Sequence, residues 1–143
     1  MGLSKRYLSD RREPVEFDPA ALGTALRKAC EEILFALLMG SARDGHVAVG
    51  SDLDLALYLE VPPSLRVVAR VQDIAASFAP GVYCDVGFLR NTEPVFRFEA
   101  LKGRLLFTRD QELFLRFFSL TCREYESQLA SYARQYSYRM GVA

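Results

Sequence analysis

The sequence has no excess of charge of either sign and no long hydrophobic run. Lys and Arg together number 18, as do Asp and Glu, in a chain of 143 residues. A protein that binds nucleic acid through many phosphates usually carries a basic excess, so nucleic acid is disfavoured as a partner. The longest apolar run, residues 33–39, is far too short to cross a bilayer. The sequence therefore predicts no association with a membrane.

Cysteines are also few: Cys30, Cys84 and Cys122 are widely spaced and form no Cys-x-x-Cys pair. Their odd number and their spacing argue against a disulfide framework and against a zinc site. We expect free thiols, buried or half-buried, in a reducing compartment. Residues 1–16 are polar and of mixed charge, without the apolar core of a signal peptide. Together these features predict a cytoplasmic protein.

Half of the residues are hydrophobic, which suits one domain with a sizeable core. Residues 1–16 are interpreted as a loose leader and residues 17–143 as a single domain. Hydrophobic periodicity predicts, in order, a helix at 18–30, strands at 33–39 and 52–59, a helix at 64–78, a strand at 82–89, a short helix at 94–101, a strand at 104–107 and a long C-terminal helix at about 109–136. This order predicts an α/β (α+β) fold, in which helices pack on a small mixed sheet of about four strands.

Local signals refine this scheme at three places. Asp18 can cap a helix that begins with Pro19, because proline is tolerated at the first helical position. Thr108 and Gln111 have the spacing of a capping box at the start of the long helix. The link between the strands at 33–39 and 52–59 is too short for a crossover helix, so this pair is predicted to be antiparallel.

Three acidic residues stand out on the predicted strands. Asp52 and Asp54 lie two apart, so their side chains project from one face, roughly 6–7 Å apart along the strand, while leucines occupy the other face. Asp85 lies on the polar face of the strand at 82–89. If these strands are neighbours, three carboxylates converge, and their repulsion and desolvation are costly.

A divalent cation would remove that cost. Mg²⁺ prefers oxygen ligands, keeps part of its water and takes further ligands from phosphate. Two such ions, about 3.5–4 Å apart, can clamp the attacking and leaving oxygens of an in-line phosphoryl displacement. The sequence therefore predicts that Asp52, Asp54 and Asp85 are both catalytic residues and metal ligands.

A possible phosphate site precedes these acids. Gly40 and Ser41 follow a buried strand, where backbone N–H groups and a hydroxyl can meet a phosphate, and glycine allows close approach. Arg43 can add positive charge toward a triphosphate. These three residues are predicted to bind nucleotide.

Gly40-Ser41, ten intervening residues and Asp52-Leu53-Asp54 match the Gly-Ser-x10-Asp-x-Asp signature of the DNA polymerase β-like nucleotidyltransferases. The chain resembles the minimal nucleotidyltransferases of this superfamily, the antitoxin partners of HEPN-domain toxins. Segment 83–86 falls where that family keeps its third carboxylate, and segment 101–110 is also similar. The resemblance covers residues 20–135.

The resemblance implies a nucleotidyltransferase fold and transfer of AMP from ATP, with Mg²⁺, to a tyrosine of a cognate HEPN ribonuclease toxin, which silences the toxin. The chain stops after one long helix, so we expect a partner protein to supply the acceptor. Two alternatives stay open: an antitoxin that inhibits by binding alone, and a small-molecule nucleotidyltransferase of the aminoglycoside-modifying type. A homo-oligomer also stays open.

Other residues allow simpler interpretations. Asp85 could instead pair with an arginine such as Arg104 on a neighbouring strand. His46, the only histidine, lies in a loop with a glycine beside it and is interpreted as a solvated residue rather than a catalyst. Tyr132 and Tyr136 are expected to pack along the last helix rather than to form an interaction surface.

Overall fold

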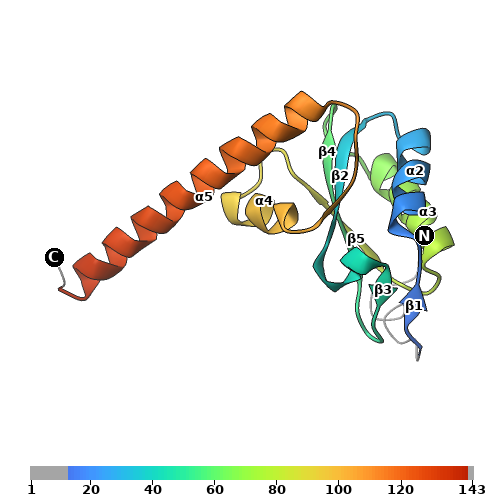
Figure 1. Ribbon diagram of the computed structural model, residues 1–143, viewed down its shortest axis with the longest axis horizontal. Coiled ribbons are helices and arrows are strands. Elements are labelled where there is room, and N and C mark those ends of the chain that lie inside the picture. The colour runs from blue at the N-terminus through green and yellow to red at the C-terminus, as the bar shows by residue number, and fades with distance from the viewer. Residues whose placement is uncertain (1–12, 142–143) are drawn as a thin grey trace.

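The computed structural model describes residues 13–141, so the first twelve residues of the predicted leader lie outside it. Figure 1 shows a mixed sheet with helices on both sides and one long helix that extends away from it. In chain order the elements are β1 (Val15–Glu16), α2 (Pro19–Ala29), β2 (Ile33–Met39), the 3₁₀ helix η1 (Gly40–Asp44), β3 (His46–Val47), β4 (Leu53–Leu59), α3 (Leu65–Phe78), β5 (Cys84–Phe88), α4 (Pro94–Leu101), β6 (Arg104–Thr108) and α5 (Gln111–Arg139).

The main sheet has four strands in the order β5-β4-β2-β6. β2 pairs antiparallel with both β4 and β6, which confirms the predicted antiparallel pair. β4 and β5 run parallel, and α3 forms the crossover between them. The predicted mixed sheet of about four strands, packed by helices, is therefore present.

Each face of the sheet has its own hydrophobic core. The leucines of β4 at positions 53, 55, 57 and 59 pack with α2 and α3 on one face. The other face carries Phe35, Ala56 and Tyr58, which pack with residues of α4 and α5 such as Ala100 and Phe117. Strand alternation places Asp54 on this second face, two residues before Ala56.

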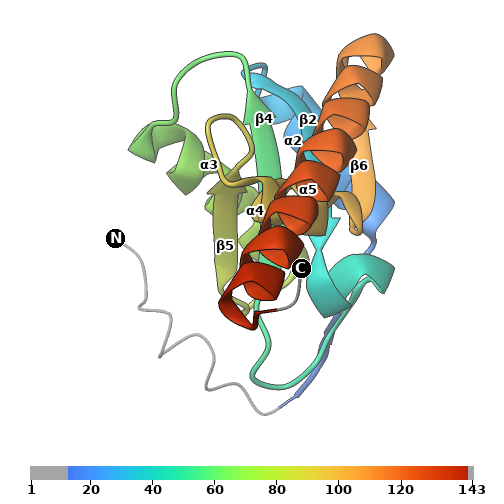
Figure 2. The same cartoon turned by 90° about the vertical axis from the view of Figure 1, so that its left-hand side faces the viewer.

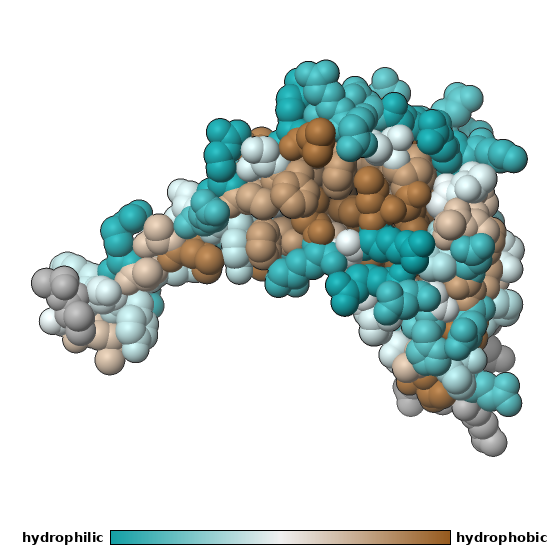
Figure 3. Space-filling view, in the orientation of Figure 1, coloured by the Kyte–Doolittle hydropathy of each residue, from teal (hydrophilic) through white to brown (hydrophobic). Residues whose placement is uncertain are grey.

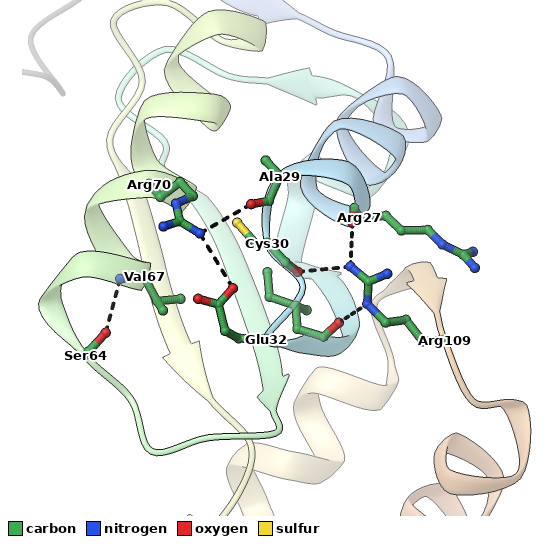
Figure 4. Close-up of polar contacts among 9 residues, drawn as sticks. Arg27, Ala29, Cys30, Glu32, Ser64, Val67, Arg70 and Arg109 are labelled. Atoms are coloured by element: carbon green, nitrogen blue, oxygen red, sulfur yellow. Dashed lines mark hydrogen bonds and ion pairs between the residues drawn. The ribbon is translucent and has the colours of Figure 1, made fainter.

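Two arginines join the C-terminal end of α2 to the rest of the fold (Figure 4). Arg109, directly after β6, donates from Nε to the carbonyl of Ile33 at 2.7 Å and from Nη2 to the carbonyl of Cys30 at 3.0 Å. Arg70, on α3, donates to the carbonyl of Ala29 at 3.3 Å. Guanidinium groups suit this position because the last carbonyls of a helix have no partner within it.

The helix starts are partly as predicted. The Asp18 side chain accepts from the backbone N–H of Ala20 at 3.0 Å and so caps α2. The predicted capping box at the start of α5 is wrong, because Thr108 is still in β6. Asp110, one residue before the helix, accepts from the N–H of Leu113 at 3.1 Å and provides the cap instead.

Several short elements have no signal in the hydrophobic pattern. β1 pairs antiparallel with β3, so the end of the predicted leader forms a small two-stranded sheet. His46 lies in β3 and is exposed, with Nδ1 3.1 Å from a carboxylate oxygen of Glu16. Cys30 and Cys84 are buried and Cys122 is half-buried, and all three are free thiols, as expected.

α5 is much longer than the sheet that it crosses (Figures 1 and 2). Of its 29 residues only Phe117 and Thr121 are fully buried, and both lie in its first half. Tyr132 and Tyr136, which were expected to pack along this helix, are largely exposed. Across residues 13–141, no helix combines the length and apolar character that crossing a membrane requires.

Candidate functional site

Asp54 and Asp85 lie directly opposite each other on two neighbouring strands. The parallel register of β4 and β5 pairs Asp54 with Asp85, and neighbouring strands lie about 4.8 Å apart. Residues paired in this way project from the same face of the sheet. Asp54 is half-buried and Asp85 is exposed. The predicted convergence of these two carboxylates, from strands that are 31 positions apart in sequence (85 − 54), is therefore present.

The Cys84 thiol is influenced by the same pair of charges. The pKa of Cys84 is raised from 9.0 to about 12, chiefly by burial and also by the negative charges of Asp54 and Asp85. A thiolate beside two carboxylates is unfavourable because like charges disfavour a further negative charge. Cys84 is thus a neutral, buried group behind the acidic pair.

Asp52 lies immediately before β4, two residues from Asp54. The backbone N–H of Leu53, between them, donates to the carbonyl of Tyr83 at 2.9 Å, which fixes this segment against the start of β5. Asp52 is half-buried. All three acids therefore lie at the end of the sheet where β4 and β5 begin, and together they form an acidic edge there.

Gly40 brings the backbone of η1 beside this edge. Met39, the last residue of β2, pairs with Asp54, and Gly40 follows with φ +69°. A Cβ built on Gly40 would lie 3.6 Å from Oδ2 of Asp54. Glycine suits this position because it adopts positive φ without steric cost and leaves room next to the carboxylate. Ser41, the next residue, is exposed.

Arg43 is exposed on η1 and contacts the turn before β6. Its Nη1 donates to the carbonyl of Lys102 at 2.9 Å, and Arg104 Nη1 donates to the carbonyl of Arg43 at 3.4 Å. These two contacts attach η1 to the end of α4 and the start of β6. This attachment is not evident from the sequence, because nothing in the local pattern relates segments 59 to 61 residues apart.

The alternative pairing of Asp85 with Arg104 is excluded by the sheet order. β5 and β6 are the two edge strands, with β4 and β2 between them. Three spacings of about 4.8 Å place them roughly 14 Å apart. Asp85 therefore faces Asp54 and not this arginine.

The donor set at this edge fits Mg²⁺. Mg²⁺ is commonly held by one or two carboxylates, with water and substrate phosphates completing its ligands, and Asp54 and Asp85 supply two paired carboxylates. Among residues 13–141 no group of three or more His, Cys, Asp or Glu side chains is close enough together to form a metal site by itself. A bound nucleotide would have to supply the remaining ligands.

The comparisons with known structures agree with this fold. A chain in a crystal structure of the toxin–antitoxin MntA–HpeT, carrying two aspartate-to-glutamate substitutions, is 18% identical with a TM-score of 0.68, over 86% of this chain and 98% of that one. A chain in a toxin–antitoxin structure with AMP-PNP is 20% identical with a TM-score of 0.67, over 86% and 98%.

A third chain comes from the tri-AMPylated Shewanella oneidensis HEPN toxin in complex with the MNT antitoxin. It is 17% identical with a TM-score of 0.62, over 86% of this chain and 99% of that one. At such identities these likenesses show the fold. No curated protein matches the sequence significantly.

A family comparison gives the assignment that structural likeness alone does not. The family model described as polymerase beta, nucleotidyltransferase, matches residues 23–112, which is more than half of the chain. The matched range includes Gly40, Ser41, Asp52, Asp54 and Asp85. The chain belongs to the polymerase beta nucleotidyltransferase family.

Proposed function

We propose that this chain is an antitoxin that transfers AMP from ATP to a tyrosine hydroxyl of a HEPN-domain toxin. The observation that carries the proposal is the pairing of Asp54 with Asp85 on the strand edge beside Gly40. Two structural neighbours support the reaction type: one is a toxin–antitoxin with AMP-PNP, and another contains a tri-AMPylated HEPN toxin. A third carries glutamates in place of two aspartates spaced two apart, the spacing of Asp52 and Asp54.

In the proposed reaction, Gly40 and Ser41 receive the triphosphate, and Arg43 adds positive charge nearby. Asp52, Asp54 and Asp85 would hold Mg²⁺, most simply as two ions, and the metal would neutralise charge that develops on the phosphates. Asp85, the exposed member of the trio, accepts the proton of the acceptor hydroxyl at a carboxylate oxygen. The hydroxyl oxygen bonds to the α-phosphorus, the bond to the β-phosphate bridge breaks, and pyrophosphate leaves.

A protein acceptor suits the exposure of this site. Ser41, Arg43 and Asp85 are all exposed. A hydroxyl on the surface of another protein can therefore reach the edge without entering a closed cavity. The partner would also position the acceptor, a task that contributes much of the rate in phosphoryl transfer.

The direct experiment incubates the full chain with labelled ATP, Mg²⁺ and a purified HEPN-domain toxin. We expect label on the toxin, loss of its ribonuclease activity, and no label when Asp54 is changed to Asn. Asp73→Asn is a matched control, because Asp73 is an exposed aspartate on α3, across the sheet from the site. Absence of label with a folded wild-type chain and an active toxin contradicts the proposal.

The same assay distinguishes an antitoxin that acts by catalysis from one that inhibits the toxin by binding alone. The double variant Asp52→Asn, Asp54→Asn should still bind the toxin but should no longer silence it durably. Full neutralisation by this variant would show that binding alone is sufficient. Labelling of a small-molecule acceptor in the absence of toxin would instead favour an aminoglycoside-type enzyme.

A further inference from the structure

α5 carries a hydrophobic seam that its own fold does not cover. Starting at Leu115, apolar or aromatic residues alternate at spacings of three and four through three heptads. The a positions are Leu115, Cys122, Leu129 and Tyr136, and the d positions are Phe118, Tyr125 and Tyr132. The exposed fractions of Leu115, Phe118, Leu129, Tyr132 and Tyr136 lie between 44% and 66%. A seam sustained over three heptads is typical of a helix that pairs with another helix.

The positions beside the seam are almost uncharged. The e positions are Ser119, Glu126 and Ala133, and the g positions are Thr121, Gln128 and Gln135. Figure 3 shows brown and tan atoms over the part of the body that α5 crosses and a second brown and tan patch on the projecting part of the helix. In coiled coils, charges at e and g select partners and reject others. With one acid in six such positions, pairing with an identical helix meets little repulsion.

We infer that this seam binds a second copy of the chain, through an antiparallel pair of α5 helices. In this arrangement an a position packs against a d position of the other helix. Phe118 then lies against Tyr136 of the second copy, Cys122 against its Tyr132, and Tyr125 against its Leu129, and two-fold symmetry repeats each layer. Six apolar layers result, and Arg139, the next d position, lies at the solvent-exposed end.

This pairing covers two exposed surfaces at once. The second half of α5 lies beyond the sheet. The first half packs on the body but leaves Leu115 and Phe118 exposed. In the antiparallel pair the far half of each helix covers the near half of the other. Tyr125 is already stacked on Phe98 of α4, with ring centroids 3.9 Å apart, so α4 supports one side of the seam without closing it.

The size of the surface predicts a reversible dimer. Three heptads of helix are about 32 Å long, and a helix with its side chains is about 10 Å wide. The seven seam residues and the six positions beside them are fewer than the roughly 20–30 residues that each partner contributes to a standard stable interface. We expect monomer and dimer to exchange with protein concentration, independently of the proposed catalytic function.

The first experiment measures the mass of the full chain by sedimentation from low micromolar to high micromolar concentration. We expect a concentration-dependent dimer for the wild type and a monomer throughout for Leu129→Glu. Ser127→Glu is the matched control, because it introduces the same carboxylate two residues away, at an f position on the opposite side of the helix. It should dimerise like the wild type. A wild type that remains monomeric over the whole range overturns the inference.

A second experiment tests the register. In Tyr132→Cys the new thiol lies opposite Cys122 of the second copy, so mild oxidation should give a covalent dimer. The control Ser127→Cys places its thiol on the outer face of the helix. It should therefore run as a monomer in non-reducing denaturing electrophoresis. Equal cross-linking of the two variants contradicts the pairing.

A helical partner protein is the competing occupant of the seam. If the chain alone is monomeric and Leu129→Glu instead abolishes its complex with the HEPN protein, the seam belongs to that partner and the inference is wrong. If the chain dimerises through the seam but labels no toxin, the inference holds and only the proposed function fails.

Discussion

At the scale of single residues, the acidic pair is a compromise between stability and chemistry. Asp54 and Asp85 are opposite each other across two strands, and like charges in that position destabilise a sheet. Changing Asp85 to Asn should therefore raise the free energy of unfolding by about 0.5 kcal/mol in the absence of metal. The same change should abolish AMP transfer. Urea denaturation and the labelling assay measure the two effects, and a fall in both quantities would argue that Asp85 is structural.

Gly40 offers a test of close approach by a phosphate. Gly40→Ala introduces a side chain at φ +69°, which should cost about 1 kcal/mol of stability. It should also weaken ATP binding, because the new methyl group lies next to Asp54. Gly50→Ala is the matched control: φ is +78°, and the added carbon would meet nothing within 4 Å. Calorimetric titration with ATP and Mg²⁺ should separate the two variants, and equal ATP affinity would exclude this role for Gly40.

Cys84 predicts a dependence of stability on alkaline pH. Its pKa in the folded protein is raised from 9.0 to about 12, chiefly by burial and further by Asp54 and Asp85. In the unfolded chain the thiol ionises near 9, so folding favours the protonated form. This contribution to stability is complete below about pH 9 and is lost as the pH rises toward 12.

Comparison of the wild type with Cys84→Ala measures that contribution. The unfolding midpoint of the wild type should fall more steeply than that of the variant between pH 9 and the folded pKa. In the native protein at neutral pH, half-buried Cys122 should react with an alkylating reagent before buried Cys84 does. If the unfolding midpoints of the wild type and Cys84→Ala change in parallel with pH, the pKa of Cys84 is the same in the folded and unfolded protein, which contradicts the prediction.

At the scale of elements, one arginine holds three segments together. Arg109 follows β6 and donates to carbonyls at the end of α2 and at the start of β2. Arg109→Ala should lower the free energy of unfolding by about 2–3 kcal/mol, because buried carbonyls lose charged donors. Arg27→Ala is the control, because the Arg27 side chain points away from this cluster in Figure 4. Urea denaturation measures both, and Arg109→Lys should rescue only in part because it lacks the planar fork.

The spacing of apolar residues predicted the main helices and strands, because each of them buries one face on which apolar residues recur regularly. The leucine alternation of β4 and the apolar run of β2 determine their places in the sheet, and the helices begin within a few residues of the predicted positions. η1, β1 and β3 were not predicted, because two-residue strands are too short to show alternation and a single 3₁₀ segment shows no α-helical period. The predicted Thr108 capping box was wrong because two nearby residues, Thr108 and Asp110, can each cap a helix, and β6 extends to Thr108, which leaves Asp110 at the start of α5.

The candidate site was predictable in part. Asp52 and Asp54 share a strand, so their common side follows from alternation alone. The pairing of Asp85 with Asp54 depends on β5 joining β4 in parallel, which no local pattern specifies. The engagement of Arg43 with Lys102 depends likewise on tertiary folding, and so does the exclusion of Arg104 from Asp85.

At the scale of the whole molecule, the chain consists of a sheet packed by helices and one long helix that extends beyond it. α4 and α5 cover the sheet face from which Asp54 and Asp85 project, so the projecting helix and the acidic edge belong to one side of the protein. A protein that contacts this side can meet both. The proposed dimer leaves the acidic edge of each copy accessible, because the contacts between the two copies are confined to α5.

The far half of α5 also lacks the support that keeps most helices formed. Beyond Thr121 none of its residues is fully buried, and in proteins most of the stability of a helix comes from tertiary packing of one of its faces. Backbone amides from Gln128 to Arg139 should therefore exchange with solvent deuterium far faster than those of β2 and β4 in dilute solution. Raising the protein concentration should slow exchange in this segment alone, so that assembly completes a helix that the monomer forms only intermittently.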